Sequence, residues 1–213
     1  MLCGVVDKQV VDKQAAIRSK KAKEAPMTLF EFLMALASVV IAIALTEIFA
    51  GWGRLLRTHI VPRLDWLHLG WSLVIVLYAI QYWVGIWPYR EIQFIYIYQV
   101  WFLIFPTLFI VLVSYAITPD IDPDTNLDLR DYYMSRRTPI FIGLAAFLAT
   151  AQIADVIILG INLSWISFAL VIISLLPAFT KQIGIHTAVM VFNLYVVLSN
   201  GFGLTPASNG LIN

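Results

Sequence analysis

The sequence predicts an all-α integral membrane protein, a polytopic bundle of about six transmembrane helices in two halves of three. The first observation is composition: of the 213 residues, 61% are hydrophobic and 13% are charged, against about 25% charged in a typical soluble domain. The second is that the charges are clustered, so that long runs carry none. Such runs require lipid rather than water as their solvent.

Six runs are apolar over the ~20 residues that a helix needs to cross the hydrocarbon core. They are residues 29–52, 66–87, 93–117, 139–159, 163–180 and 182–204. Backbone groups in lipid must hydrogen-bond within their own segment, so we expect each run to form a helix.

Aromatic and basic residues flank these runs, as they do at membrane–water interfaces. The tryptophans expected at an interface are Trp52, Trp66 and Trp87. The arginines expected to anchor helix ends are Arg54, Arg57, Arg136 and Arg137. We expect the last two to contact lipid phosphates.

Two polar segments interrupt the apolar pattern. Residues 118–138 form a predicted loop that divides the transmembrane domain, residues 27–213, into its two halves. Residues 1–26 form a basic tail that contains the tandem VVDKQVVDKQ and lacks the apolar core of a signal peptide. We expect this tail to be disordered. The alternatives are a basic helix on the membrane surface and an extension upstream of a true start at Met27.

The basic residues predict an orientation, because lysine and arginine beside a span favour the cytoplasm. From Met27 onward, seven of them flank the side that holds the 118–138 loop, and Arg90 flanks the other. The seven are Arg54, Arg57, Arg63, Arg130, Arg136, Arg137 and Lys181. This imbalance predicts a cytoplasmic (inner) membrane with the loop inside and both termini outside. The six basic residues of the tail would bring the two sides to equal numbers.

The 118–138 loop carries acids at alternate positions, beginning with Asp120, Asp122 and Asp124. Oxygen ligands alternate in the same way in an EF-hand calcium loop. However, Thr125 stands where that loop needs its turn glycine, and Asp131 stands where it needs the closing glutamate. We therefore expect a solvated acidic linker and no metal site.

Polar residues within the apolar runs are the candidates for a transport path, because an ionisable group in lipid is costly unless it faces protein or water. The candidates are Glu47, His68, Gln152, Asp155, His186 and Asn193. Since helix direction alternates, Glu47 and both histidines fall on the side of the 118–138 loop. Gln152 and Asp155 fall on the opposite side, and Asn193 falls near the middle. Two polar layers are expected.

Glu47 has two interpretations. Gly51 and Arg54 follow it at i+4 and i+7, so the three residues share one helix face. In the first interpretation the carboxylate pairs with Arg54 and anchors the helix at the interface. In the second it joins His68 or His186 in a proton or cation site at the cytoplasmic mouth.

Asp155 also has two interpretations. It has no basic neighbour in its own run, and Gln152 precedes it by three residues on the same helix face. An acid in this place is either protonated or paired with a group from another helix. Alternatively, Asp155 caps the helix at the external interface, about one turn before Gly160.

Two histidines from different runs at similar depth, His68 and His186, match the axial ligands of a haem b. Interfacial histidines that hydrogen-bond to headgroups are commoner, so we expect no cofactor. The chain also lacks the sequence motifs of hydrolases, nucleotide-binding proteins and zinc peptidases, and we expect no enzyme. Its net charge of +1 does not indicate nucleic-acid binding.

Two functions remain. The first is an oligomeric channel or transporter for protons or a small cation, although polar residues are sparse in the middle of the predicted bundle. The second is an accessory or scaffolding subunit of a larger membrane complex, for which the aromatic run FIYIYQVWFLIF offers a surface. The expected partners are the lipid bilayer and either further copies of the chain or other subunits.

Overall fold

The computed structural model describes residues 10, 12–14, 27–57, 65–91, 96–120, 128–162 and 165–201. The predictions for most of the tail (1–26), for Arg63 and for the acidic stretch 121–127 lie outside the described residues. Between Leu29 and Gly201 the described chain forms six α-helices and one 3₁₀ helix. They are α2 (Leu29–Arg57), α3 (Trp66–Gly85), η1 (Trp87–Glu91), α4 (Ile97–Ile117), α5 (Leu129–Leu159), α6 (Trp165–Phe179) and α7 (Ile183–Gly201).

Each predicted run forms a helix, which confirms the all-α bundle. Four helices are long and apolar enough to cross a membrane: α2, α3 together with η1, α4 and α5. The other two, α6 and α7, are shorter apolar helices. With 15 residues, α6 is roughly 22 Å long at 1.5 Å per residue, which is less than the ~30 Å hydrocarbon core. Of the six expected spans, four are therefore long enough to cross a membrane.

The structure corrects the predicted loop 118–138, because its second half is helical. α5 begins at Leu129, where the Asp128 carboxylate accepts hydrogen bonds from the backbone N–H groups of Arg130 and Asp131. This is the N-cap contact that acids commonly make. Pro139 lies inside α5, where it removes one backbone donor without ending the helix.

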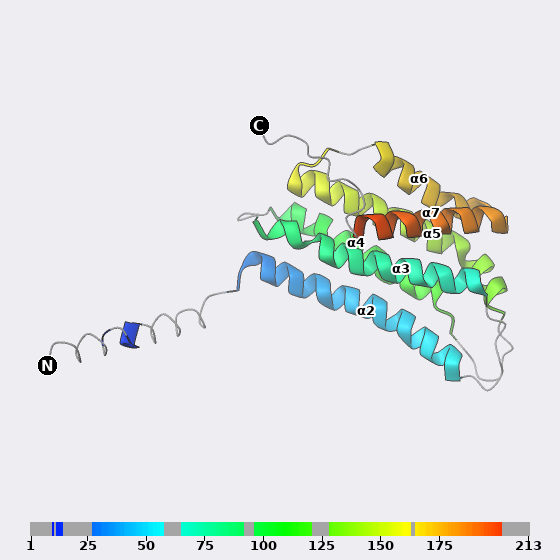
Figure 1. The fold of residues 1–213 in the computed structure, drawn as a ribbon, viewed down its shortest axis with the longest axis horizontal. Coiled ribbons are helices and arrows are strands. Elements are labelled where there is room, and N and C mark those ends of the chain that lie inside the picture. Colours follow the sequence, from blue (N-terminus) through cyan, green and yellow to red (C-terminus); the bar gives the residue numbers. More distant parts are fainter. Residues whose placement is uncertain are drawn as a thin grey trace.

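The helices lie lengthwise beside one another in a single bundle (Figure 1). α3 is its central helix, since it contacts α2, α4, α5 and α7. The two halves are joined by contacts of α4 with α5 and of α3 with α7.

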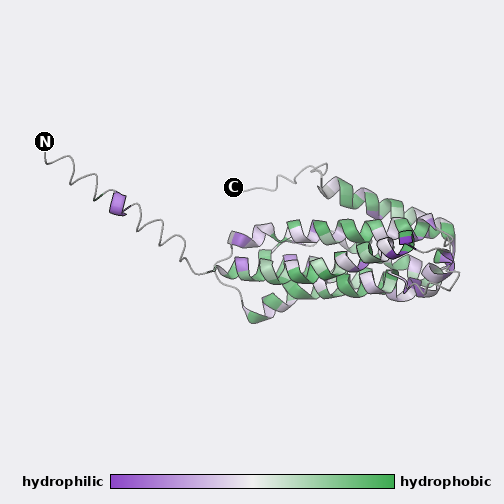
Figure 2. Ribbon diagram, turned by 90° about the horizontal axis from the view of Figure 1, so that it is seen from below, coloured by the Kyte–Doolittle hydropathy of each residue, from purple (hydrophilic) through white to green (hydrophobic). Residues whose placement is uncertain are grey.

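Hydrophilic residues gather toward the ends of the helices, and the middle of the bundle is predominantly hydrophobic (Figure 2). At one end, α2, α4 and α6 finish where α3, α5 and α7 begin. We call this the charged end, and the opposite end the pocket end. Contacts across the charged end include His68 with Ile117 and Thr138 with Ala178.

Glycines allow three close helix contacts. A Cβ atom added to Gly143 of α5 would lie 2.6 Å from Cγ2 of Val113 in α4. One added to Gly51 would lie 2.5 Å from Cγ2 of Thr118, and one added to Gly70 would lie 2.5 Å from Sδ of Met190. Small residues at these positions let the helix backbones approach closely, as in other membrane bundles.

We predict that Gly143→Ala lowers the free energy of unfolding by about 1–3 kcal/mol, because the new methyl group overpacks against the stiff Val113 side chain. Gly184→Ala is the matched control, since an added Cβ there meets no heavy atom within 4 Å. Equilibrium unfolding in mixed micelles measures both variants. Equal stability of the two would contradict the close α4–α5 contact.

Candidate functional site

A cavity of about 260 Å³ lies at the pocket end. Its walls come from the last turns of α3, the C-terminal half of α5, the start of α6 and the end of α7, with η1 beside them. The polar lining residues are Gln81, Gln152, Asp155 and Ser167, together with three tyrosines. Gln152 and Asp155 therefore share one site, as their spacing predicts.

Asp155 carries the formal negative charge of this cavity. Its Oδ1 accepts a hydrogen bond of 2.5 Å from the hydroxyl of Tyr89 in η1. Among the described residues that line the cavity, none is Lys, Arg or His. Asp155 does not cap α5: backbone N–H groups and the left-handed Gly160 (φ 67°) end that helix. The interpretation with a partner from another element is confirmed, and that partner is neutral.

The two glutamines of the cavity differ in their hydrogen bonding. Nε2 of Gln152 donates to the backbone carbonyl of Ser167 in α6, at 3.2 Å. Oε1 of Gln81 is buried and has no hydrogen-bond partner in the described structure. A buried acceptor without a donor is costly; because this oxygen is enclosed by protein atoms, a ligand in the cavity reaches it only after the Gln81 amide rotates.

Aromatic rings form a wall of the same cavity. The Phe147 ring lies 5.9 Å from that of Tyr78 and 5.8 Å from that of Tyr82, both in edge-to-face geometry. The Tyr82 hydroxyl donates to the Leu103 carbonyl in α4, at 2.6 Å. This ring system holds α3 against α4 and α5.

The sequence analysis missed these tyrosines because it treated them as apolar aromatic residues. A signal for them exists: Tyr78, Tyr82 and Tyr89 follow one another at i, i+4 and i+11, which is one face of a helix. Their hydroxyl groups bond to three different helices.

Asn193 lies between the two ends, where it joins α3, α6 and α7. Its Oδ1 accepts hydrogen bonds from the hydroxyls of Tyr78 (2.8 Å) and Ser174 (3.0 Å). Its Nδ2 donates to the Val189 carbonyl at 2.9 Å. Asn193 and Ser174 are fully buried. The middle of the bundle is therefore more polar than its sequence suggests.

His186 lies toward the charged end and uses both ring nitrogens. Its Nε2 lies 2.9 Å from the Thr180 carbonyl, and its Nδ1 lies 2.6 Å from the hydroxyl of Tyr133. A carbonyl oxygen only accepts, so Nε2–H is the donor, and Nδ1 of the neutral ring accepts from Tyr133.

His68 is buried and its Nε2–H donates to the Ile117 carbonyl at the end of α4, at 2.8 Å. Its Nδ1 has no partner in the described structure. Axial ligation of haem needs a free nitrogen on each histidine. His186 has none, so this pair does not fit a haem b.

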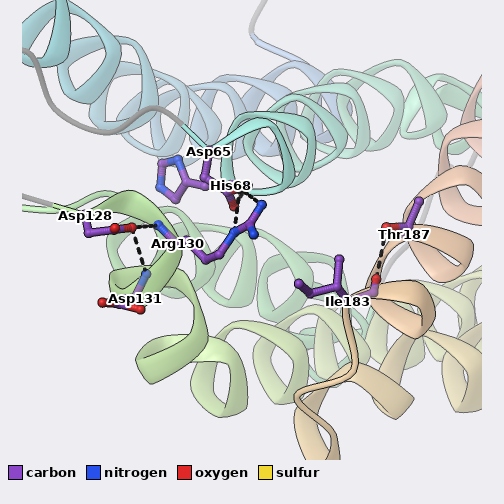
Figure 3. Close-up of polar contacts among 7 residues, drawn as sticks. All are labelled: Asp65, His68, Asp128, Arg130, Asp131, Ile183 and Thr187. Carbon is purple, nitrogen blue, oxygen red and sulfur yellow. Dashed lines mark hydrogen bonds and ion pairs between the residues drawn. The ribbon is translucent and has the colours of Figure 1, made fainter.

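An ion pair at the charged end was also missed. Asp65 is 4% exposed, and its Oδ1 accepts from Nε (3.0 Å) and from the terminal nitrogen Nη2 (2.8 Å) of Arg130. Its Oδ2 accepts from the backbone N–H of His68, so Asp65 also caps α3. Figure 3 shows the Arg130 guanidinium turned toward Asp65. The pair ties the start of α3 to the start of α5.

Glu47 pairs with Arg54 at 3.0 Å, as the first interpretation predicts. Gly51, on the same face, packs against Thr118 at the end of α4. In the described part of the chain Glu47 forms no hydrogen bond with His68 or His186. Both histidines bond to backbone carbonyls, and His186 bonds also to Tyr133. Glu47 therefore lies on the helix face that packs against α4, and it is not part of a cluster with the two histidines.

The other expected anchors differ in exposure. Trp66 and Trp87 are half exposed, whereas Trp52 is partly buried against Phe49. Arg57 donates to the Gly53 carbonyl of its own helix. Arg137 donates to the Met134 carbonyl, and Arg136 is exposed on α5. Contact of these residues with lipid stays a prediction.

The fold and site define a membrane-type helical bundle with a mainly hydrophobic interior, a few buried polar side chains that join its helices, and an acidic cavity at one end. Among the described residues, no group of three or more His, Cys, Asp or Glu side chains is arranged to hold a metal ion. Comparison with protein-family models, with curated proteins and with solved structures finds no match to the chain.

We predict that Asn193→Leu lowers the free energy of unfolding by about 1–2 kcal/mol, because two buried hydroxyls lose their acceptor. Ser199→Ala is the control, since this buried hydroxyl on α7 bonds within its own helix. Unfolding in mixed micelles gives both values. A loss no larger for Asn193→Leu than for Ser199→Ala would contradict an interhelical role.

Proposed function

We propose that the protein is a membrane transporter or channel that moves protons or a small cation, with Asp155 as the cation-binding carboxylate. One observation carries the proposal: a carboxylate lines a cavity of about 260 Å³ whose described lining has no basic residue. An uncompensated acid in a low-dielectric interior attracts a proton or a cation.

The depth of the polar groups supports a path along the bundle. Tyr78, Tyr82 and Tyr89 line the cavity, and the Tyr78 hydroxyl bonds to Asn193, the next polar group toward the charged end. Farther along lie the Tyr133–His186 pair and then the Asp65–Arg130 pair. A proton needs only a few such groups with water between them.

In this proposal the cavity faces the external side of a cytoplasmic (inner) membrane, and the charged end faces the cytoplasm. The excess of arginine at the charged end supports this orientation. The active form is a homo-oligomer, since a small bundle with two short helices gains lateral support from further copies.

We predict that Asp155→Asn reduces flux to the level of protein-free liposomes, because the amide binds no proton or cation in the acid's place. Proton flux is measured with an internal pH dye and a potassium gradient, and sodium and potassium fluxes with isotopes. Glu31→Gln is the matched control: this exposed acid caps the start of α2 and lies outside the cavity lining. Unchanged flux in folded Asp155→Asn would remove Asp155 from the mechanism.

We predict that Glu47→Gln keeps more than about half of the flux, because the amide retains a hydrogen bond to Arg54 and exposed or half-exposed ion pairs contribute little. The same liposome assay measures it. A loss as complete as that of Asp155→Asn would place Glu47 in the path as well.

An accessory or scaffolding subunit is the second candidate, and a feature of α4 favours it. Large apolar side chains stand exposed on α4 at alternating spacings of three and four residues, the spacing of a helix-pairing seam. They are Tyr98, Trp101, Phe105, Leu108, Leu112 and Tyr115. Native mass spectrometry of gently extracted protein separates the candidates, since co-purifying foreign chains favour the subunit and a homo-oligomer favours the transporter.

A further inference from the structure

We propose that the cavity beside Asp155 binds a small organic amine in its protonated form. The inference rests on the proposed transport function in one respect, because this amine would then be the cation carried. The binding site itself stands on the cavity alone.

The charge and hydrogen-bonding groups of the cavity favour an ammonium ion. Asp155 supplies the negative charge, and Oε1 of Gln81 is a buried acceptor without a donor. Tyr89 already donates to Oδ1 of Asp155, which leaves Oδ2 as the carboxylate oxygen available to a ligand. Oδ2 of Asp155 can accept from an ammonium group directly, and Oε1 of Gln81 can accept once its amide rotates toward the cavity. A primary ammonium group carries three N–H donors.

The shape and the apolar lining favour an organic rather than a metal cation. The rings of Tyr78, Tyr82 and Phe147 form one wall, and aromatic faces attract ammonium groups. Leu148, Leu170 and Val196 add apolar surface for an alkyl chain. Hard metal cations are commonly held by several carboxylates among about six or more oxygen ligands, whereas Asp155 is the one carboxylate among the described lining residues. A bare ion would also leave most of the ~260 Å³ empty.

The test is ligand binding to the full chain in nanodiscs, by calorimetry and ligand-observed NMR. The probes are propylammonium, the neutral isostere propan-1-ol, and sodium ion. We expect propylammonium to bind and the other two to bind far more weakly. Asp155→Asn should weaken propylammonium binding by at least ~30-fold, as expected for removing the partner of a buried charge. Gln81→Met should weaken it by roughly 5–10-fold, the cost of one hydrogen bond.

Controls separate a lost site from a lost fold. Thermal unfolding must show that each variant retains the wild-type transition, and Glu31→Gln must retain wild-type affinity. Equal binding of propan-1-ol, or retained affinity in Asp155→Asn, would overturn the amine site. A lack of propylammonium binding to the folded wild-type protein would also overturn the amine site. If proton flux in that case still depends on Asp155, the proposed transport function is retained. Binding with no flux would retain the amine site and reject transport.

Discussion

The structure depends on one constraint: a buried polar side chain in an apolar solvent needs a hydrogen-bond partner, and where its own helix offers none, the partner must come from a neighbouring helix. Lipid offers no hydrogen bonds, so helix packing and polar pairing have to be solved together. Asn193 shows this most fully, because one side chain joins α3, α6 and α7. The hydroxyls of Tyr82 and Tyr133 serve the same purpose at other depths.

The two ends of the bundle meet this constraint differently. At the charged end, acids face arginines: Asp65 with Arg130, and Glu47 with Arg54. At the pocket end, Asp155 faces a tyrosine hydroxyl and a cavity. A charge that is balanced by a fixed partner stabilises the fold. A carboxylate that lies beside an open cavity has affinity for a proton or a mobile cation. This asymmetry is why the functional proposals centre on Asp155 rather than on Glu47 or the histidines.

Several features of the site could be predicted separately from the sequence. The depth of Glu47, His68, Gln152, Asp155 and His186 followed from helix direction alone, and the Glu47–Arg54 pair followed from helical spacing. The tyrosines and the Asp65–Arg130 pair were not foreseen. In a sequence, a tyrosine counts as an apolar residue, because the partner of its hydroxyl is not known. Arg130 reaches Asp65 only after α5 has folded against α3.

The sequence by itself determined the class of protein, its helices and the polar groups' depth, because hydrophobic run length and helix direction are local properties. The predicted loop 118–138 extended too far, because α5 begins at Leu129, where Asp128 provides the cap. Only the tertiary structure decided which polar groups meet. The rotation of each helix about its axis, and the helices against which it packs, depend on contacts between residues up to 115 positions apart, such as Tyr78 and Asn193. These contacts created the cavity beside Asp155 and gave both nitrogens of His186 partners.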